Sequence, residues 1–238
     1  MKREQKTSGL RRILSHPVAY DAYDALVGTR AVRRAFVREY VQAFPGAHLL
    51  DLGCGAGKVL RYLPSVIYTG VDISSAYIKA AQRRHRDRGT FILGSATDVD
   101  FGPDHSFDIV VAFALLHHIN DANAQKVMSR AKRALRPGGR LVTLDPCFET
   151  GQNRFARFLH KKDRGRHVRY LDAYLKLAHM AFDAVTARVL HNLHPVLPST
   201  LLIMTCVAPP SGPPSVQSGE RGLDHAHPPS RERASSNE

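Results

Sequence analysis

The feature that most constrains the fold is a regular alternation of short apolar segments and amphipathic segments between residues 48 and 144. Short apolar runs bounded by turn residues are typical of buried strands, and apolar residues that recur at spacings of three and four are typical of helices. Strands that alternate with helices predict a parallel sheet covered by helices on both faces. The expected strands span residues 48–52, 66–72, 91–93, 108–113 and 140–144, and the expected helical segments span residues 58–63, 74–88 and 121–135.

Both flanks of this region have their own patterns. Residues 18–44 show a helical pattern that is interrupted at Gly28 and ends at Pro45-Gly46. A basic, helical insert covers residues 152–180, and two further strands are expected at 184–190 and 201–207. The expected domain therefore spans residues 17–207, with a helical cap at 17–44 and the basic insert at 152–180.

The two ends of the chain are expected to lie outside the folded domain. Residues 1–16 form a loose basic arm. Residues 208–238 are rich in Pro, Ser and Gly and have almost no large apolar side chain. Such a segment cannot bury enough apolar surface to offset the entropy lost on ordering, so we expect a disordered tail.

Composition narrows the functional classes. The longest unbroken apolar run, Ile109–Leu116, is far too short to span a bilayer, and no apolar stretch of signal-peptide length follows the basic N-terminus. The three cysteines match neither a disulfide framework nor a zinc pattern, so we expect a cytoplasmic protein without a metal. A net charge of +13 is compatible with nucleic acid, an anionic membrane surface or acidic substrates as partners, or with a simple bias toward arginine.

A glycine-rich loop follows the first strand. Glycines in this place allow a tight turn and let a ligand approach the backbone. The loop is not a P-loop, because Val59 stands after Lys58 where that motif needs Ser or Thr. A dinucleotide-binding loop stays an alternative, although the third glycine comes one residue early. The loop reads Asp51-Leu52-Gly53-Cys54-Gly55-Ala56-Gly57.

An acidic residue, Asp72, ends the second strand 21 residues after Asp51. A carboxylate at this place in an α/β fold can accept hydrogen bonds from both hydroxyls of a ribose. The alternative is an ordinary helix-capping role ahead of Ser74 and Ser75. The loop and the acid together favour a nucleoside-containing ligand.

Four motifs, in this order, resemble the class I S-adenosylmethionine-dependent methyltransferases, in particular bacterial members of small-molecule type. The motifs cover residues 49–57, 68–74, 107–119 and 135–141. The resemblance runs from about Leu14 to Cys206. It implies a Rossmann-like doubly wound α/β fold with a seven-stranded sheet, mostly parallel with one antiparallel C-terminal strand, and S-adenosyl-L-methionine as the cofactor.

The resemblance also implies a cofactor site. Asp72 would hold the ribose, and Ser95 stands where the family usually has an Asp that binds the adenine amino group. A serine hydroxyl bonds more weakly, so Asp98, or backbone and apolar contacts, are alternatives. The full set of expected cofactor-binding residues is Asp51, Gly53, Cys54, Gly55, Gly57, Asp72, Ile73, Ser95, Ala96 and Phe113.

The cofactor carries an already activated methyl group, so positioning contributes much of the catalysis, on the order of 7–11 kcal/mol, and no fixed catalytic dyad is expected. His117 is the candidate general base, because a histidine can hold a proton near neutral pH. The alternative is a local structural role, since the family often has paired histidines here. Cys147 is not expected to act as a nucleophile, because the reaction does not need one.

Four residues are candidates for contact with the methyl acceptor. Tyr20 and Tyr23 lie on the N-terminal helix, which covers the cofactor in similar enzymes; packing against the core is the alternative. Arg164 and Arg166 belong to the insert after the fifth strand, where related enzymes bind substrate. They would suit an anionic acceptor, and a solvated surface is the alternative.

The expected function is methyl transfer from S-adenosylmethionine to an oxygen, nitrogen or carbon atom of an unidentified small molecule, with an anionic acceptor as one option. Nucleic acid is a less favoured partner, and no insertion into a membrane is expected. Two alternatives stay open: an RNA methyltransferase, suggested by the net charge, and a non-catalytic cofactor-binding or scaffold protein.

Overall fold

The computed structural model describes residues 29–162, 166–193 and 197–210. Most of the N-terminal segment, including Tyr20 and Tyr23, lies outside the described residues, as do Arg164 and residues 211–238.

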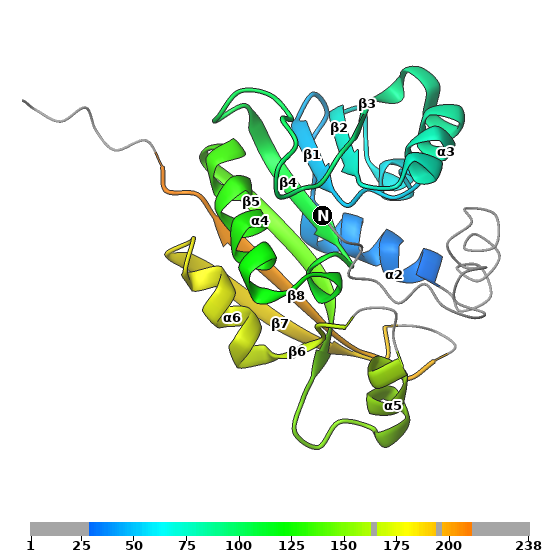
Figure 1. Cartoon of the computed structure of the whole chain (residues 1–238), viewed down its shortest axis with the longest axis vertical. Helices are drawn as coiled ribbons and strands as arrows, with labels where there is room; N and C mark the ends of the chain where they lie inside the picture. Colours follow the sequence, from blue (N-terminus) through cyan, green and yellow to red (C-terminus); the bar gives the residue numbers. More distant parts are fainter. Residues whose placement is uncertain (1–28, 163–165, 194–196, 211–238) are drawn as a thin grey trace, which may run out of the picture.

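One mixed sheet organises the structure (Figure 1). Its strand order is β3-β2-β1-β4-β5-β8-β7, and the two-residue β6 pairs with the end of β5. Strands β1 to β5 run parallel in this sheet, while β8 is antiparallel to both of its neighbours. This confirms the expected Rossmann-like sheet with one antiparallel C-terminal strand; the short β6 was not predicted. The strands are β1 His48–Leu52, β2 Ile67–Asp72, β3 Thr90–Leu93, β4 Phe107–Phe113, β5 Leu135–Phe148, β6 Arg169–Tyr170, β7 Ala184–His191 and β8 Thr200–Val207.

Helices pack on both faces of the sheet, as expected. Side chains alternate along each strand, so Leu50 and Val110 face a core shared with α4 and α6, whereas Leu49 and Ile109 face a core shared with α2 and α3. The α-helices are α2 Thr29–Phe36, α3 Ser75–His85, α4 Asp121–Ala134, α5 Arg154–Lys162 and α6 Leu171–His179. A π-helical turn, η2, covers Val37–Val41, and 3-10 turns cover Leu60–Tyr62 (η3), Arg86–Arg88 (η4) and Leu116–His118 (η5).

The ends of α4, the longest of these helices, are stabilised by residues that the sequence places there. The Asn120 side chain accepts a hydrogen bond from the Asn123 N–H at 3.0 Å, which caps the first turn. Asp121 stands in the first turn and two basic residues in the last, in the sense that the helix dipole favours. The buried stripe consists of Ala124, Val127, Met128, Ala131 and Ala134.

Three local predictions were wrong in extent. The expected helical segment at 58–63 is only the 3-10 turn η3, because Pro64 follows and prevents a further turn. The N-terminal helical region ends at Val41, where Gln42 takes a left-handed conformation, and not at Pro45. The strand expected at 140–144 is the longer β5, Leu135–Phe148, and its pairing with β4 jumps from Leu135 to Arg140.

The chain stays docked slightly beyond the last strand. Ala208 is buried and its N–H donates to the Gly139 carbonyl at 2.8 Å, and the Gly138 N–H donates to the Pro209 carbonyl at 3.2 Å. In the described part of the chain, no helix combines the length and apolar character needed to cross a membrane.

Candidate functional site

The site is formed at the carboxyl ends of β1, β2, β3 and β4, which lie side by side in Figure 1. Parallel strands bring the loops that follow them to one edge of a sheet, and open α/β folds bind ligands at that edge. The expected cofactor residues from Asp51 to Phe113 all lie on these strand ends or in the loops after them.

The glycine loop is anchored to the end of β2. The N–H groups of Gly53 and Cys54 donate to the Val71 carbonyl at 2.8 and 3.0 Å. Gly57 has φ +69°, and a Cβ there would lie 2.8 Å from the His85 ring, so only glycine fits. A Cβ on Gly55 would meet no atom within 4 Å of the part of the chain that is described, so this point of the loop faces open space.

Asp72 holds the loop in place. Its Oδ2 accepts from the Gly55 N–H at 2.9 Å and its Oδ1 accepts from the Ser74 N–H at 2.7 Å. A carboxylate oxygen can accept more than one hydrogen bond. Two apolar side chains beside it are unusually exposed, Ile73 at 46% and Leu93 at 55%. Leu93 lies opposite Asp72 on the neighbouring strand β3, and the sequence alone did not mark it as a site residue.

Asp51 is buried behind the loop. Its Oδ2 accepts a hydrogen bond from the Tyr68 hydroxyl at 2.7 Å, and its Oδ1 has no partner among the described residues. Burial raises the pKa of this carboxyl to about 7, against the lowering effect of the Tyr68 bond. A buried carboxylate oxygen of this kind is suited to a nearby positive charge. Tyr68 was missed because nothing in its sequence context marks it as more than a strand residue.

In the loop after β3, side-chain hydroxyl groups form a short series of hydrogen bonds. Thr97 donates its hydroxyl to Asp98 at 2.7 Å, so the 2.7 Å contact between Ser95 and Thr97 has Ser95 as the donor. The Ser95 oxygen then acts as an acceptor, which is the role that a ligand amino group needs. The Ala96 carbonyl accepts from Arg130 of α4 at 3.2 Å, a support that the sequence did not reveal.

The end of β4 turns sharply into η5. Ala114 has φ +55°, a conformation that residues with a Cβ seldom adopt, and its N–H donates to the Leu144 carbonyl at 2.7 Å. Phe113 just before it is half-buried, with its ring 5.3 Å from the Phe36 ring and 5.0 Å from the Arg33 guanidinium. The turn brings His117 over the end of β5.

His117 is paired with Asp145, the residue that sequence reasoning missed. Asp145 Oδ1 accepts from the His117 N–H at 3.0 Å and lies 2.8 Å from Nδ1 of the same residue. Both side chains are buried, and burial raises the pKa of Asp145 while the bonds from His117 oppose the rise. A carboxylate next to Nδ1 assigns the proton to that nitrogen, which makes Nε2 the basic one.

A buried arginine, Arg169, fixes the loop that carries His117. Its guanidinium donates to the carbonyls of Leu116 at 2.8 Å and Ile119 at 2.7 Å, and pairs with the Asp121 carboxylate at 2.8 Å. These bonds join the insert after β5 to the loop after β4 across about fifty positions of sequence. Sequence analysis placed Arg169 in the basic insert without a role.

Of the four acceptor candidates, only Arg166 belongs to the described residues. Arg166 is exposed, while Tyr20, Tyr23 and Arg164 are outside the described residues. Cys147 is buried, and burial raises the pKa of its thiol to about 12, so it cannot supply a thiolate at neutral pH.

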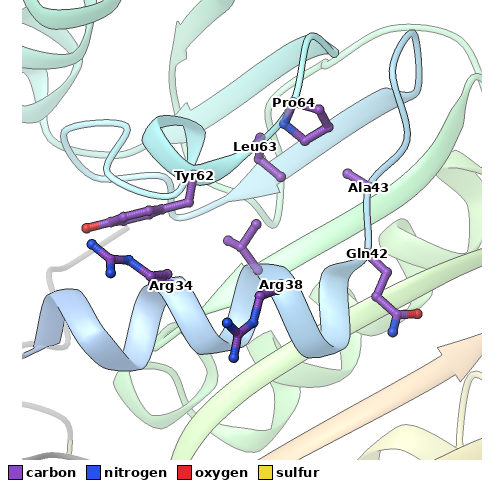
Figure 2. Close-up of a pocket in the computed structure, with 8 residues that line it drawn as sticks. Arg34, Arg38, Gln42, Ala43, Tyr62, Leu63 and Pro64 are labelled. Atoms are coloured by element: carbon purple, nitrogen blue, oxygen red, sulfur yellow. The ribbon is translucent and has the colours of Figure 1, made fainter.

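A groove lies on the face of the sheet that α2 covers (Figure 2). This groove of about 540 Å³ runs between α2–η2 and the segment after η3. The Arg34 guanidinium lies 5.9 Å from the centre of the Tyr62 ring on one side of it. Its lining includes none of the expected cofactor-binding residues. It is lined by Arg34, Val37, Arg38, Gln42, Ala43, Tyr62, Leu63 and Pro64.

Comparison with known proteins finds similar methyltransferases. Residues 50–143 match the family model described as a methyltransferase domain. The chain is 34% identical over 127 residues to a demethylmenaquinone methyltransferase of Symbiobacterium thermophilum. The aligned segment covers 48% of this chain and 47% of the relative. It is 39% identical over 108 residues to the 27-O-demethylrifamycin SV methyltransferase of Amycolatopsis mediterranei, covering 42% and 39% of the two chains. The chain thus spans less than half the length of these curated relatives.

A solved structure extends the likeness of fold to most of the chain. Phosphoethanolamine N-methyltransferase 2 of Haemonchus contortus, in complex with phosphomonomethylethanolamine and S-adenosylhomocysteine, superposes with a TM-score of 0.68. The match covers 84% of this chain and 59% of that one at 20% identity.

Proposed function

From a match of residues 50–143 to a methyltransferase domain, we propose that the protein is a methyltransferase. The chain has the fold of the class I S-adenosylmethionine-dependent methyltransferases. In this proposal, it transfers a methyl group from S-adenosylmethionine to an oxygen, nitrogen or carbon atom of a small molecule. The observation that carries the proposal is the pairing of the glycine loop with Asp72, whose carboxylate receives the Gly55 N–H at 2.9 Å. This arrangement places the loop backbone and the Asp72 carboxylate at the same edge of the sheet.

The residues at this edge fit the parts of S-adenosylmethionine. The cofactor supplies an electrophilic methyl group on a positively charged sulfur. Asp72 would accept from the ribose hydroxyls, and the unpartnered Oδ1 of Asp51 would offset the positive charge of the methionyl part. The Ser95 oxygen would accept from the adenine amino group, with Ile73 and Leu93 providing apolar contacts. Gly53, Cys54, Gly55, Gly57, Ala96 and Phe113 complete the proposed cofactor site.

His117 is the proposed base for acceptors that must lose a proton. Asp145 acts as a positioning residue, because its carboxylate fixes the Nδ1–H form of the ring and so makes Nε2 the proton acceptor. The pH profile of kcat/KM distinguishes this role from a structural one. His117→Gln should remove a limb of the profile if the ring takes the proton, and should lower activity equally at every pH if the ring only supports the loop.

The acceptor is a small molecule in this proposal, in keeping with the molecules for which the two bacterial relatives are named. The proposed contacts of the acceptor are Arg164, Arg166, Tyr20 and Tyr23. Of these, Arg166 is exposed in the insert. The three cysteines are buried thiols without disulfides, which supports a place of action in the reducing cytoplasm.

Calorimetry with S-adenosylmethionine, S-adenosylhomocysteine and NAD tests the cofactor assignment. Asp72→Ala removes two charge-assisted hydrogen bonds to the ribose, each worth on the order of 1.5–3 kcal/mol, so the affinity should fall at least tenfold. Asp100→Asn is the matched control, because its carboxylate also accepts a backbone N–H, from Gly102 at 2.9 Å, but stands outside the site. Tight binding of NAD, or unchanged affinity in a folded Asp72 variant, would refute the assignment.

The acceptor itself can be identified by incubating the protein with methyl-labelled cofactor and a small-molecule extract, followed by mass spectrometry of the labelled product. Label recovered only in RNA would replace the small-molecule proposal by the RNA alternative.

A further inference from the structure

The outward face of α5 carries two exposed phenylalanine side chains. Phe155 is 51% exposed and Phe158 is 52% exposed, although each is large and apolar. Their ring centres lie 6.5 Å apart and their planes differ by 18°, so the two rings form one continuous apolar surface. Large exposed apolar surfaces on a protein mark sites of interaction with a partner or a membrane.

The helix is held so that this face points outward. On its inner side Ala156 is buried, and His160 Nδ1 lies 3.1 Å from Gln152 Nε2, which in turn contacts the Cys147 carbonyl at 3.2 Å. The helix therefore rests on the end of β5 by its opposite side. Figure 1 shows α5 past the end of β5 and outside the helices that cover the sheet.

The charged residues within α5 all have one sign. The α5 sequence contains Arg154, Arg157, Lys161 and Lys162 and no acidic residue. Arg154 and Lys161 are exposed on the same side as the phenylalanines. A short helix with aromatic side chains flanked by cations has the two attractions that hold a helix at a bilayer surface, namely burial of apolar side chains and attraction to anionic headgroups.

We propose that the outward face of α5 docks the protein on the surface of an anionic lipid bilayer. Phe155 and Phe158 enter the interfacial layer, and Arg154 and Lys161 meet the lipid phosphates. A second copy of the chain is a poorer occupant, because a symmetric contact would bring the same cations together. Since α5 rests on the end of β5, docking turns the carboxyl edge toward the lipid. If the proposed methyl transfer holds, an acceptor with an apolar body would reach the site from the bilayer.

Co-sedimentation of the whole protein with vesicles tests the docking directly and needs no acceptor. Vesicles of phosphatidylcholine with about 30% phosphatidylglycerol should bind the protein at least tenfold more tightly than phosphatidylcholine alone, and added salt should weaken the binding. Phe155→Ala/Phe158→Ala should lower the binding about tenfold. Phe44→Ala is the matched control, because Phe44 is 50% exposed at the other edge of the sheet and should not affect binding.

Fluorescence gives an independent reading of position, because the chain contains no tryptophan. Phe158→Trp introduces a single probe, and its emission should shift to shorter wavelength when phosphatidylglycerol vesicles are added. Phe44→Trp should show no shift. All four variants should keep the melting curve and the cofactor affinity of the unmodified protein, which would show that folding and the cofactor site are intact. A failure of the docking proposal can then be told apart from a failure of the proposed function.

Three results would overturn the docking proposal. The first is no binding to phosphatidylglycerol vesicles. The second is binding that the double phenylalanine variant leaves unchanged, since charge alone would then be responsible. The third is sedimentation of the lipid-free protein as a dimer that the same variant dissociates, or an RNA complex that only this variant weakens, since either would assign the face to another partner.

Discussion

Proton release on cofactor binding is the sharpest consequence of the site, and it depends on Asp51. Burial raises the pKa of this carboxyl from 3.8 to about 7, so in the ligand-free protein it is about half protonated at neutral pH. If its Oδ1 faces the positive charge of S-adenosylmethionine, only the ionised form binds well. Binding at pH 6.5 should then release a proton, and the affinity should rise with pH.

The size of the effect follows from the ionised fraction. With a pKa of about 7, roughly one carboxyl in thirty is ionised at pH 5.5 and one in two at pH 7, so the dissociation constant should fall about fifteenfold over this range. The amino group of the cofactor does not confuse the measurement, because its ordinary pKa is about 8 and it stays charged below pH 7. Calorimetry in buffers of different ionisation enthalpy counts the protons released.

The variant Asp51→Asn keeps an acceptor for the Tyr68 hydroxyl but cannot ionise. Its affinity should be lower at pH 7 and constant within about twofold from pH 5.5 to 7. Asp108→Asn is the control: burial alone would raise the pKa of Asp108, but hydrogen bonds from His48 and Arg136 and the charge of Arg136 lower it, so it stays ionised over this range. An unchanged pH dependence in the Asp51 variant would refute the role given to this residue.

The same group predicts how stability depends on pH. A carboxyl whose pKa is higher in the folded protein binds more protons there than in the unfolded chain, so its contribution is full below pH 3.8 and is lost as the pH rises through about 7. The loss is on the order of 4 kcal/mol. The free energy of unfolding of the ligand-free protein, measured with urea, should therefore fall over this pH range. In the Asp51→Asn variant this part of the fall should be absent.

Three further predictions concern the frame of the site. Arg169→Met should cost about 3–5 kcal/mol in urea unfolding, because it leaves the carbonyls of Leu116, His167 and Ile119 without their buried donor. The exposed Arg166→Met should stay within about 0.5 kcal/mol, and equal effects would contradict the anchoring role. Gly57→Ala should lower both cofactor affinity and melting temperature more than Gly46→Ala, since both have positive φ but only the former meets a side chain, at 2.8 Å. Truncation after Pro210 should leave the melting temperature within a few degrees, and a larger loss would show that residues 211–238 dock on the domain.

The sheet was predictable because its signals are local. The apolar run that forms β4 and the glycine loop after β1 each follow from a few adjacent residues. The extent of η3 was not predictable by periodicity, because three residues before a proline give too short a pattern to measure. The parallel pairing of β1 with β2, which the alternation of elements already implied, brings Gly55 after β1 next to Asp72 at the end of β2.

The partners of the functional residues were beyond the sequence because they come from distant segments. Asp145 lies 28 positions from His117 and Tyr68 lies 17 positions from Asp51, and neither has a motif of its own. Arg169 looks like one more cation in a basic insert until the fold buries it beneath the loop after β4. A buried arginine that donates to three carbonyls and a carboxylate has a different role from an exposed one, and only the three-dimensional packing separates the two.

The two halves of the site are consequently built in different ways. The cofactor half depends on strand ends and on a loop that pairs with the adjacent strand, so its geometry is fixed by the same hydrogen bonds that make the sheet. The acceptor half depends on Arg169 and on the bond from the His167 N–H to the His117 carbonyl at 3.0 Å, which tie the insert after β5 to the loop that carries His117. A change in the insert can therefore move His117 without disturbing Asp72. In the proposed function, changes in the insert would alter the acceptor contacts and leave the cofactor contacts in place. Motifs locate the proposed cofactor half because its signals are local, whereas the proposed acceptor half must be found by experiment.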